Sequence, residues 1–176
     1  MTKDYSYSVN ILNPINEQLI NDWITEFKGI YVIEHSDFDS VISNLIYGAI
    51  QAVETFTNHI LGLYEVVVSV SSCSGMFELP LLPVSNISIS DSQDVKRFGK
   101  SHIKLTSLEP IEVTYNAGFD SEIPNDIKLA IFDYVNVLFS MEDSKITGLE
   151  KEQILKSILK IRLYKYKMDA DVTALL

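Results

Sequence analysis

The stretch that decides the fold reads IEVTYNAGFDSEIPNDIKLAIFDYVNVL and spans residues 111–138. Its first six residues alternate between apolar and polar side chains, which is the pattern of a half-buried β-strand. Asn116, Gly118 and Asp120 then favour or tolerate the backbone angles of a tight turn, and Pro124 suits the first turn of a helix. The stretch therefore predicts a strand, a tight connection and a helix with one buried face. The apolar residues at helical spacing are Ile127, Ala130, Ile131, Tyr134, Val135 and Leu138.

The chain begins with polar and aromatic residues that show no clear period, and we expect an extended arm or a frayed terminus there. Residues 15–28 then carry apolar side chains at helical spacing, and Gly29 can end that helix. The single tryptophan, Trp23, lies on the apolar face of this helix. We interpret it as a core residue rather than an interface residue.

The longest and most regular helix is predicted over residues 37–61, with Ser36 as its N-cap and Gly62 as its C-cap glycine. A broad apolar stripe runs along it. The stripe is wider than the seam of a coiled coil, which favours burial within a domain. It comprises Phe38, Val41, Ile42, Leu45, Ile46, Ala49, Ile50, Val53, Phe56 and Ile60.

Between residues 63 and 116 the pattern changes to short segments rich in β-branched residues. Turn residues, among them Pro80, Pro83 and Gly99, separate these segments. A third helix is expected over residues 124–142. The predicted fold class is α+β: a helical bundle of about four helices, with a small antiparallel β-sheet inserted between the long second helix and the third helix. The strand candidates are residues 64–71, 76–79, 87–90, 95–98, 103–106 and 111–116.

A basic helix is predicted at the C-terminal end of the chain. Thr147 and Glu150 match the capping box, so this helix should begin near Gly148. Because it is amphipathic and basic, three roles are open: closing the core, lying on a membrane surface, or docking into a partner. We therefore divide the chain into a single domain over residues 1–144 and a basic C-terminal helix and tail over residues 145–176.

Composition and charge indicate a soluble protein with one core. The chain has 176 residues, of which 47% are hydrophobic, with no apolar run of membrane-spanning length and no signal-peptide pattern. Residues 1–144 carry 7 basic and 20 acidic side chains, a net charge of −13, whereas residues 145–176 carry 7 and 4, a net charge of +3. An acidic body repels the phosphate backbone, which disfavours sequence-specific nucleic-acid binding. The basic helix could bind nucleic acid or an acidic protein surface. Alternatively, its lysines form a face that is in contact with solvent alone.

The sequence carries none of the common catalytic motifs: no phosphate-binding loop, dinucleotide fingerprint, zinc-protease helix or nucleophile elbow. Ser72, Cys73, Ser74 and Gly75 look superficially like a nucleophile loop, but no base accompanies them. We interpret Cys73 as a strand-end residue, and we expect a turn at Ser74 and Gly75. The acidic segment 91–94 lacks the glycine and the distal glutamate of an EF-hand. One cysteine and three scattered histidines form no zinc pattern. We predict no enzyme activity, no metal and no cofactor.

Three segments, taken in order, resemble a known family. DFDSVISNLI with AIQAVETFTNHILG (residues 37–62) resembles its long helix, FELPLLPVSNISI (residues 77–89) its strand pair, and VTYNAGFD through IPNDIKLAI (residues 113–131) its strand, turn and helix. Together they are similar to the head-tail connector proteins of long-tailed bacteriophages, also called head-completion or portal adaptor proteins. One departure is Thr57-Asn58, where the family commonly has Thr-Gly.

The resemblance implies a structural virion protein that is not an enzyme. Family members form a ring, usually of twelve copies, between the portal protein and the tail or stopper proteins, and double-stranded DNA passes through the ring without sequence-specific binding. Such a protein is found in the virion neck, and in the host cytoplasm during assembly. The alternatives are another neck or tail-completion protein of similar fold, or a small ligand-binding or enzymatic domain. The portal-contact candidates are Lys156, Lys160, Arg162, Tyr164, Lys165 and Tyr166, and the structural turn and cap residues are Gly62, Pro80, Pro83, Gly118 and Pro124.

Overall fold

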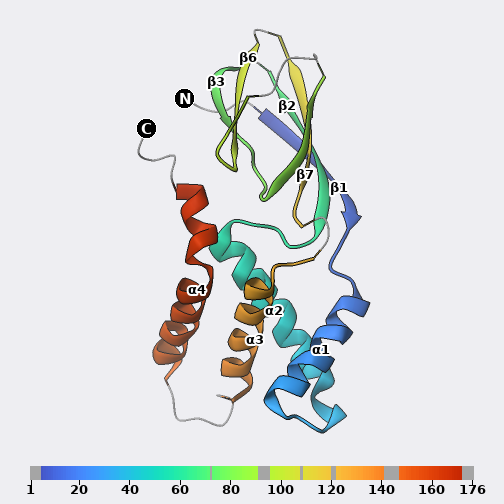
Figure 1. Ribbon diagram of the computed structural model, residues 1–176, viewed down its shortest axis with the longest axis vertical. Helices are drawn as coiled ribbons and strands as arrows, with labels where there is room; N and C mark the ends of the chain where they lie inside the picture. The colour runs from blue at the N-terminus through green and yellow to red at the C-terminus, as the bar shows by residue number, and fades with distance from the viewer. Residues whose placement is uncertain are drawn as a thin grey trace. The chain divides into compact units, whose positions relative to one another are not determined.

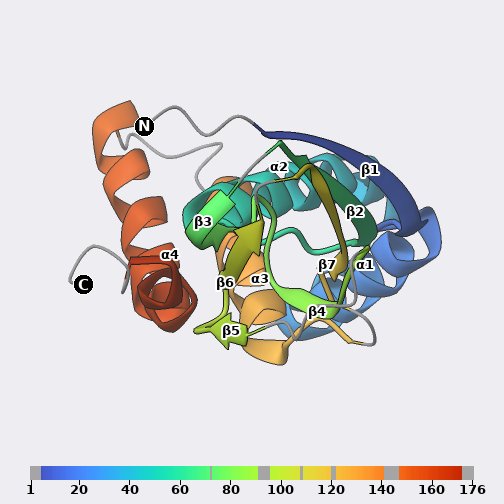
Figure 2. The same ribbon diagram turned by 90° about the horizontal axis from the view of Figure 1, so that it is seen from above.

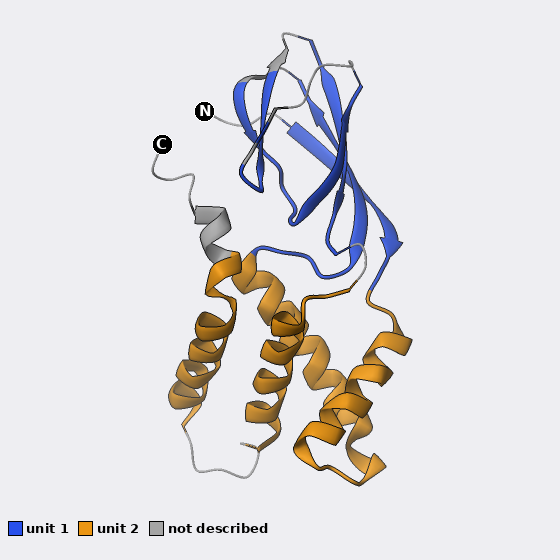
Figure 3. Cartoon of the chain, viewed as in Figure 1, with its two compact units in different colours: residues 1–14, 58–121, 169–176 blue, residues 15–57, 122–168 orange. Residues whose placement is uncertain are grey.

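A computed structural model describes most of the chain and divides it into two compact units (Figure 3). The β unit comprises residues 5–14 and 58–119, with residues 169–171 of the last helix, and the helical unit comprises residues 15–57 and 122–168. Helices and small antiparallel sheets together confirm the predicted α+β class. The residues described are 5–71, 73–90, 96–107, 109–119, 122–140 and 147–171.

The predicted helices are all present in the helical unit (Figure 1). Their apolar faces form a common core, in which Trp23 is 4% exposed and lies against Phe132. The assignment of Trp23 to the core is therefore confirmed. The elements are α1 (Glu17–Tyr31), the 3₁₀ turn η1 (Ser36–Phe38), α2 (Asp39–Thr57), α3 (Asn125–Ser140) and α4 (Gly148–Asp171). The buried core residues of α1 to α3 are Ile20, Trp23, Ile24, Phe27, Ile42, Ile46, Ala49, Ile50, Val53, Ile127, Ala130, Ile131, Phe132 and Val135.

Helix α1 is capped at both ends, but it ends later than predicted. At its start, the Asn16 side chain accepts a hydrogen bond from a backbone N–H of the first turn. At its end, the helix passes Gly29 and stops at Tyr31. Val32 then adopts a left-handed conformation with φ 55°, and its N–H donates to the Lys28 carbonyl. A β-branched residue is strained in this conformation, which glycine adopts freely.

We expect the substitution Val32→Gly to raise the free energy of unfolding of the helical unit by about 1 kcal/mol, because it relieves this strain. Little burial is lost, since the Val32 side chain is 79% exposed. Urea unfolding followed by Trp23 fluorescence measures the change. Val41→Gly is the matched control: it places glycine inside α2 and should lower the stability instead. Equal effects of the two substitutions would contradict the strain at Val32.

The predicted caps of the long helix are both displaced. Ser36 is not the N-cap: it opens η1, which has no side-chain cap, and α2 begins one turn later at Asp39. A short 3₁₀ turn often leads into an α-helix, which the sequence pattern does not reveal. At the other end, α2 stops at Thr57 and Asn58 takes the left-handed conformation with φ 56°. Asn58 thus occupies the position expected of Gly62, because asparagine tolerates this conformation.

The β unit contains two antiparallel sheets, visible in Figure 2. The four-stranded sheet has the order β1 (Tyr5–Asn13), β2 (Leu63–Val70), β7 (Ile111–Ala117), β4 (Val84–Ile89). The three-stranded sheet has the order β3 (Cys73–Glu78), β6 (His102–Ser107), β5 (Lys96–Phe98). The six strands from β2 to β7 agree with the predicted insert between the second and third helices.

Strand β1 corrects the prediction of an extended arm or a frayed terminus. It pairs with β2 from Tyr5, opposite Val70, to Asn13, opposite Leu63. Its apolar residues alternate with serine and asparagine, but nearly all of them are exposed. A strand at the edge of a sheet shows a weak pattern of burial because it has a neighbour on one side alone.

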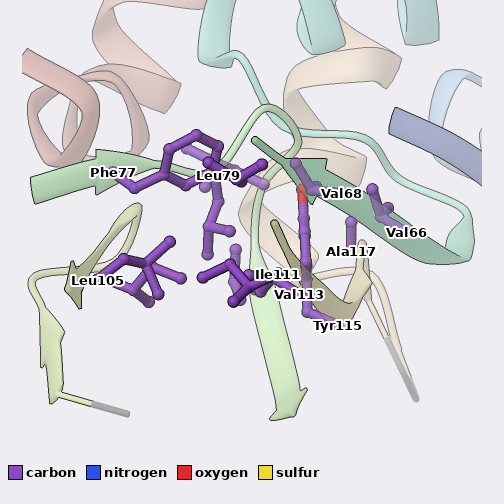
Figure 4. Close-up of a cluster of buried hydrophobic side chains, with 13 residues drawn as sticks. Val66, Val68, Phe77, Leu79, Leu105, Ile111, Val113, Tyr115 and Ala117 are labelled. Carbon is purple, nitrogen blue, oxygen red and sulfur yellow. The ribbon is translucent and has the colours of Figure 1, made fainter. Parts of the chain in front are cut away.

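Side chains from both sheets meet in one core (Figure 4). Tyr115 is fully buried in it, and its hydroxyl oxygen accepts a hydrogen bond from the Leu81 N–H at 3.2 Å. Burial raises the pKa of the Tyr115 hydroxyl to about 12. The core residues are Val66, Val68, Val70, Phe77, Leu79, Leu82, Val84, Ile103, Leu105, Ile111, Val113, Tyr115 and Ala117.

Two predicted turns have different outcomes. The turn at Ser74 and Gly75 is wrong, because Gly75 lies inside β3, opposite Leu105, with φ 132°. Without a Cβ, glycine can adopt this angle within a strand. Gly99, with φ 62°, lies in the turn between β5 and β6, as predicted. Residues 91–94, considered above for calcium, lie outside the described residues.

Three segments of the β unit meet at Gly118, directly after β7. Its φ is 100°, and its N–H donates to the Pro83 carbonyl at 2.9 Å. A Cβ placed on Gly118 would lie 1.8 Å from the carbonyl oxygen of Gly62, so the two backbones are in direct contact. Pro80 and Pro83 lie between β3 and β4, outside the strands, where their missing N–H groups interrupt no ladder.

Candidate docking surface on the C-terminal helix

Helix α4 begins at Gly148, and its predicted capping box is present. The Thr147 N–H donates to the Glu150 carboxylate at 2.9 Å, the Thr147 hydroxyl donates to it at 2.8 Å, and the Glu150 N–H returns a bond to the hydroxyl at 3.4 Å. These hydrogen bonds hold the pKa of the Glu150 carboxyl below its ordinary value. The helix start was therefore readable from Thr147 and Glu150 alone.

One face of α4 closes the core of the helical unit. Leu155, Leu159 and Leu163 lie on this face at helical spacing, and all three are buried. Of the three roles left open for this helix, closing the core is thus present in the fold. No helix in the described ranges is both long enough and apolar enough to cross a membrane.

Arg162 and Asp133 hold α4 against α3. The Arg162 guanidinium donates from Nε at 3.0 Å and approaches from Nη2 at 2.8 Å, both to Oδ2 of Asp133. The Tyr31 hydroxyl of α1 donates to the other carboxylate oxygen at 3.2 Å. Partial burial and the Asp133 charge raise the pKa of the Tyr31 hydroxyl to about 12. Asp133 therefore links α1, α3 and α4.

Asp126 forms a second link, two helical turns before Asp133 on α3. Lys165 approaches Asp126 Oδ2 at 2.5 Å, and the Tyr166 hydroxyl donates to Oδ1 at 2.9 Å. Asp126 precedes Asp133 on α3, whereas its partner Lys165 follows Arg162 on α4. The two helices therefore run antiparallel. Asp126 lies in the first turn of α3, and the carbonyl of Pro124 accepts the first hydrogen bonds of that helix.

The second link should weaken in acid. Partial burial alone would raise the pKa of the Asp126 carboxyl, but the hydrogen bonds from Lys165 and Tyr166 outweigh it and the pKa is lowered. A carboxyl with a lowered pKa stabilises the fold above its ordinary pKa of about 4, and this contribution is lost as the pH falls through the lowered value.

We therefore expect Asp126→Asn to lower the free energy of unfolding by about 1 kcal/mol at pH 7, and to make a smaller difference at pH 2. Urea unfolding followed by Trp23 fluorescence at both pH values measures this. Lys165→Met should lower the stability with the same pH dependence, because it removes the other partner. The link would be contradicted if Asp126→Asn lowered the free energy of unfolding by the same amount at both pH values.

The six predicted portal-contact residues fall into two groups. Arg162, Lys165 and Tyr166 are engaged within the helical unit, as described. Lys156, Lys160 and Tyr164 are exposed, although Lys156 also contacts Glu152 of the same helix at 2.5 Å. The exposed group lies with Ile161, which is 82% exposed. We define Lys160, Ile161 and Tyr164 as the outer face of α4.

Sequence reasoning missed Ile161 because it chose the portal-contact candidates among the basic and tyrosine side chains of the helix. The signal was present: the buried leucines at 155, 159 and 163 fix the inner face, and Ile161 lies off that face. Within the described residues, no group of three or more histidine, cysteine or acidic side chains is placed to hold a metal ion. Cys73 begins strand β3, at the strand end where it was expected.

No protein-family model and no curated protein match this sequence. In solved structures, the chain is similar to a chain from the neck of an empty gene transfer agent (GTA) particle computed with C6 symmetry, with a TM-score of 0.57 and 14% identity, over 86% of this chain and 94% of that chain. A second match is in the neck of the native GTA particle computed with C12 symmetry, with a TM-score of 0.55 and 14% identity, over 88% and 94%. This chain has the fold of a particle-neck subunit.

A third match, in the virion of the native GTA particle, has a TM-score of 0.53 and 13% identity, over 85% of this chain and 93% of that chain. The neck fold spans both units, because each match covers most of this chain. The resemblance to head-tail connectors, drawn from three sequence segments, is thereby confirmed at the level of the fold. The division at residue 144 and the portal-contact residues stay predictions.

Proposed function

We propose that this protein is a structural, non-enzymatic neck subunit that forms a ring between the portal and the tail or stopper proteins. The observation that carries the proposal is the neck fold, which is shared over at least 85% of this chain and 93% of the matching chains. The ring completes the head after DNA packaging.

We propose twelve copies for the ring: one neck to which the chain is similar was computed with C12 symmetry and another with C6 symmetry, and a ring of twelve is compatible with both. Its channel is the DNA exit path. The net charge of −10 suits this role, because an acidic wall offers few sites to neutralise phosphates and lets DNA slide. The protein is found in the virion neck, and in the host cytoplasm during assembly.

The outer face of α4 binds the portal. Lys160 supplies a positive charge, while Ile161 and Tyr164 supply apolar contact area at 82% and 51% exposure. Tyrosine is one of the residue types that contribute most of the energy at protein interfaces, and Ile161 extends the exposed apolar area beside Tyr164. Arg162, Lys165 and Tyr166 support this face indirectly by fixing α4 on α3.

The test mixes the purified chain with the portal ring encoded by the same genome and counts copies by cryo-electron microscopy. We expect twelve subunits on the portal with α4 at the contact. Lys160→Glu combined with Tyr164→Ala should abolish binding, whereas Lys104→Glu, an exposed site on β6, should not. Substitutions are preferable to removing α4, because its three buried leucines belong to the core.

Binding to a tail protein but not to the portal would instead favour another neck or tail-completion protein of similar fold. This alternative is supported by the same observation, since the matching structures are described as neck and virion without a named partner. Retained portal binding by the Lys160 and Tyr164 double variant would contradict the docking face while leaving the ring proposal intact.

A further inference from the structure

Strand β1 is an edge strand that lacks the usual protections over its described residues 5–11. It ends the order of the four-stranded sheet, so the backbone groups along its outer edge have no strand partner within the described part of the β unit. It is nine residues long, reads YSYSVNILN, and contains no charged residue and no proline. Natural proteins usually block such edges with lysine, proline, bulges or a covering segment, because an open edge pairs with other chains.

The opposite edge of the same sheet is protected. Strand β4 changes register between Ser85 and Ser88, and Asn86 within this irregularity has φ 51°. An irregularity of this kind interrupts the row of backbone donors and acceptors that a second strand would need. In β1 the register shift falls at the far end, between Ile11 and Asn13, and the strand pairs evenly with β2 from Tyr5 to Ile11. The two edges of one sheet are therefore built differently.

An apolar row continues from the core onto this open strand. Tyr5 is half-buried against Phe77, with ring centroids 5.4 Å apart. Tyr7, Val9 and Ile11 follow on the same face of the sheet. Tyr7 and Val9 lie opposite Val68 and Val66, which are buried. The row nevertheless becomes exposed, at 49% for Tyr7, 40% for Val9 and 65% for Ile11.

We propose that β1 is the surface through which neighbouring copies of this chain bind one another. An extended segment of the neighbouring copy lies along the edge of β1 and covers Tyr7, Val9 and Ile11. The contact joins different surfaces of the two copies, because a contact between identical surfaces closes a dimer, whereas a ring needs a head-to-tail contact. This inference rests on the proposed ring function.

Charge favours a second copy over other occupants. Each copy carries a net charge of −10, so two copies meet more readily through surfaces that add no like-charge contacts. The nine uncharged residues of β1 provide such a surface. A nucleic acid or a strongly acidic or basic partner would instead need charged groups at the contact, and β1 offers none.

The test substitutes both Val9→Lys and Ile11→Lys. Lysine is a natural protection of edge strands and both side chains are exposed, so the variant should fold. The matched control is Met76→Lys, at a 49% exposed site on β3 in the other sheet. We expect the double variant to weaken self-association, measured by sedimentation velocity over a concentration series, by about tenfold or more. Copy counts on the portal ring should drop below twelve, and the control should match the unmodified chain.

Amide hydrogen exchange on the unmodified chain gives a second measurement that needs no substitution. Residues 5–13 should exchange more slowly in the assembled ring than in the free subunit. A complete ring formed by the double variant, or unchanged exchange in residues 5–13 on assembly, would overturn the inference and leave the ring function standing. A dimer joined through β1, with no larger species and no portal binding, would overturn the ring instead. If the unmodified chain stays monomeric at every concentration and does not bind the portal, both the ring function and the β1 interface are overturned.

Discussion

Replacing Gly118 by alanine should lower the free energy of unfolding of the β unit by about 3 kcal/mol or more, a size reached when a substitution forces backbone segments apart. A Cβ at this position would lie 1.8 Å from the carbonyl oxygen of Gly62 and 2.8 Å from its carbonyl carbon. Both atoms belong to the backbone, so no side chain can rotate away. The φ of 100° adds strain for any residue that has a Cβ.

The cost spreads beyond the clash itself. The Gly118 N–H donates to the Pro83 carbonyl, so any shift of Gly118 also loosens the connection that leads into β4. Gly62 directly precedes β2, and Gly118 directly follows β7, its neighbour in the sheet. The register of these two strands places Tyr64 opposite Ala117, next to the contact. Separating the two glycines therefore strains the ladder at the centre of the four-stranded sheet.

Gly99→Ala is the matched control. Gly99 also has a positive φ, of 62°, but a Cβ there meets no atom within 4 Å. We expect it to cost about 1 kcal/mol, the strain of the left-handed conformation alone. Urea unfolding followed by far-ultraviolet circular dichroism, with amide exchange in β2 and β7, measures both variants. A loss at Gly118 no larger than the loss at Gly99 would show that the backbone contact is unimportant.

The glycines also show which parts of this fold the sequence encodes locally. The freedom of Gly118 was predictable, because a turn must follow the strand at residues 111–116. The role of Gly62 was not. It reads as a helix cap, yet α2 ends at Thr57, and a Cβ on Gly62 would lie 2.9 Å from the Tyr64 ring. The backbone of Gly62 in turn leaves room only for a glycine at position 118, which is distant in the sequence. Local sequence patterns predict the helices and strands. Contacts between segments that are distant in the sequence decide at which position a glycine is required.

The same limit applies to the candidate site. The start of α4 was predictable from Thr147 and Glu150, which lie within one turn. The partners of its basic residues were not predictable, because Arg162 and Lys165 pair with acids on another helix. Asp126 lies in the first turn of α3, where an acid favours the helix dipole, and it also holds Lys165. A basic residue in an acidic chain meets an internal partner as readily as an external one, and composition does not distinguish the two.

The second large effect is expected in the helical unit, where Phe132→Ala should cost about 4 kcal/mol, the usual loss when a buried phenylalanine is truncated. Phe132 is fully buried on α3 and contacts two aromatic rings of α1. Its ring centroid lies 6.1 Å from that of Trp23 at an interplanar angle of 88°, and 5.7 Å from that of Phe27 at 78°. Edge-to-face pairs of this kind stabilise beyond the area they bury.

The matched control is Phe139, which lies two turns further along the same helix. Phe139 is half-buried and stacks edge-to-face on Phe38, which is itself 42% exposed. We expect Phe139→Ala to cost about 1 to 2 kcal/mol, because part of its ring already contacts solvent and the cavity left can fill with water. The comparison therefore separates burial from residue type.

Trp23 makes the measurement specific to the helical unit. It is the single tryptophan of the chain and it contacts Phe132 directly, so its fluorescence reports the environment that Phe132→Ala changes. Urea unfolding followed at this signal should show a midpoint shift at least twice as large for Phe132→Ala as for Phe139→Ala, in the ratio of the two expected losses. Equal midpoints for the two variants would mean that the aromatic cluster of Trp23, Phe27 and Phe132 does not hold α1 against α3.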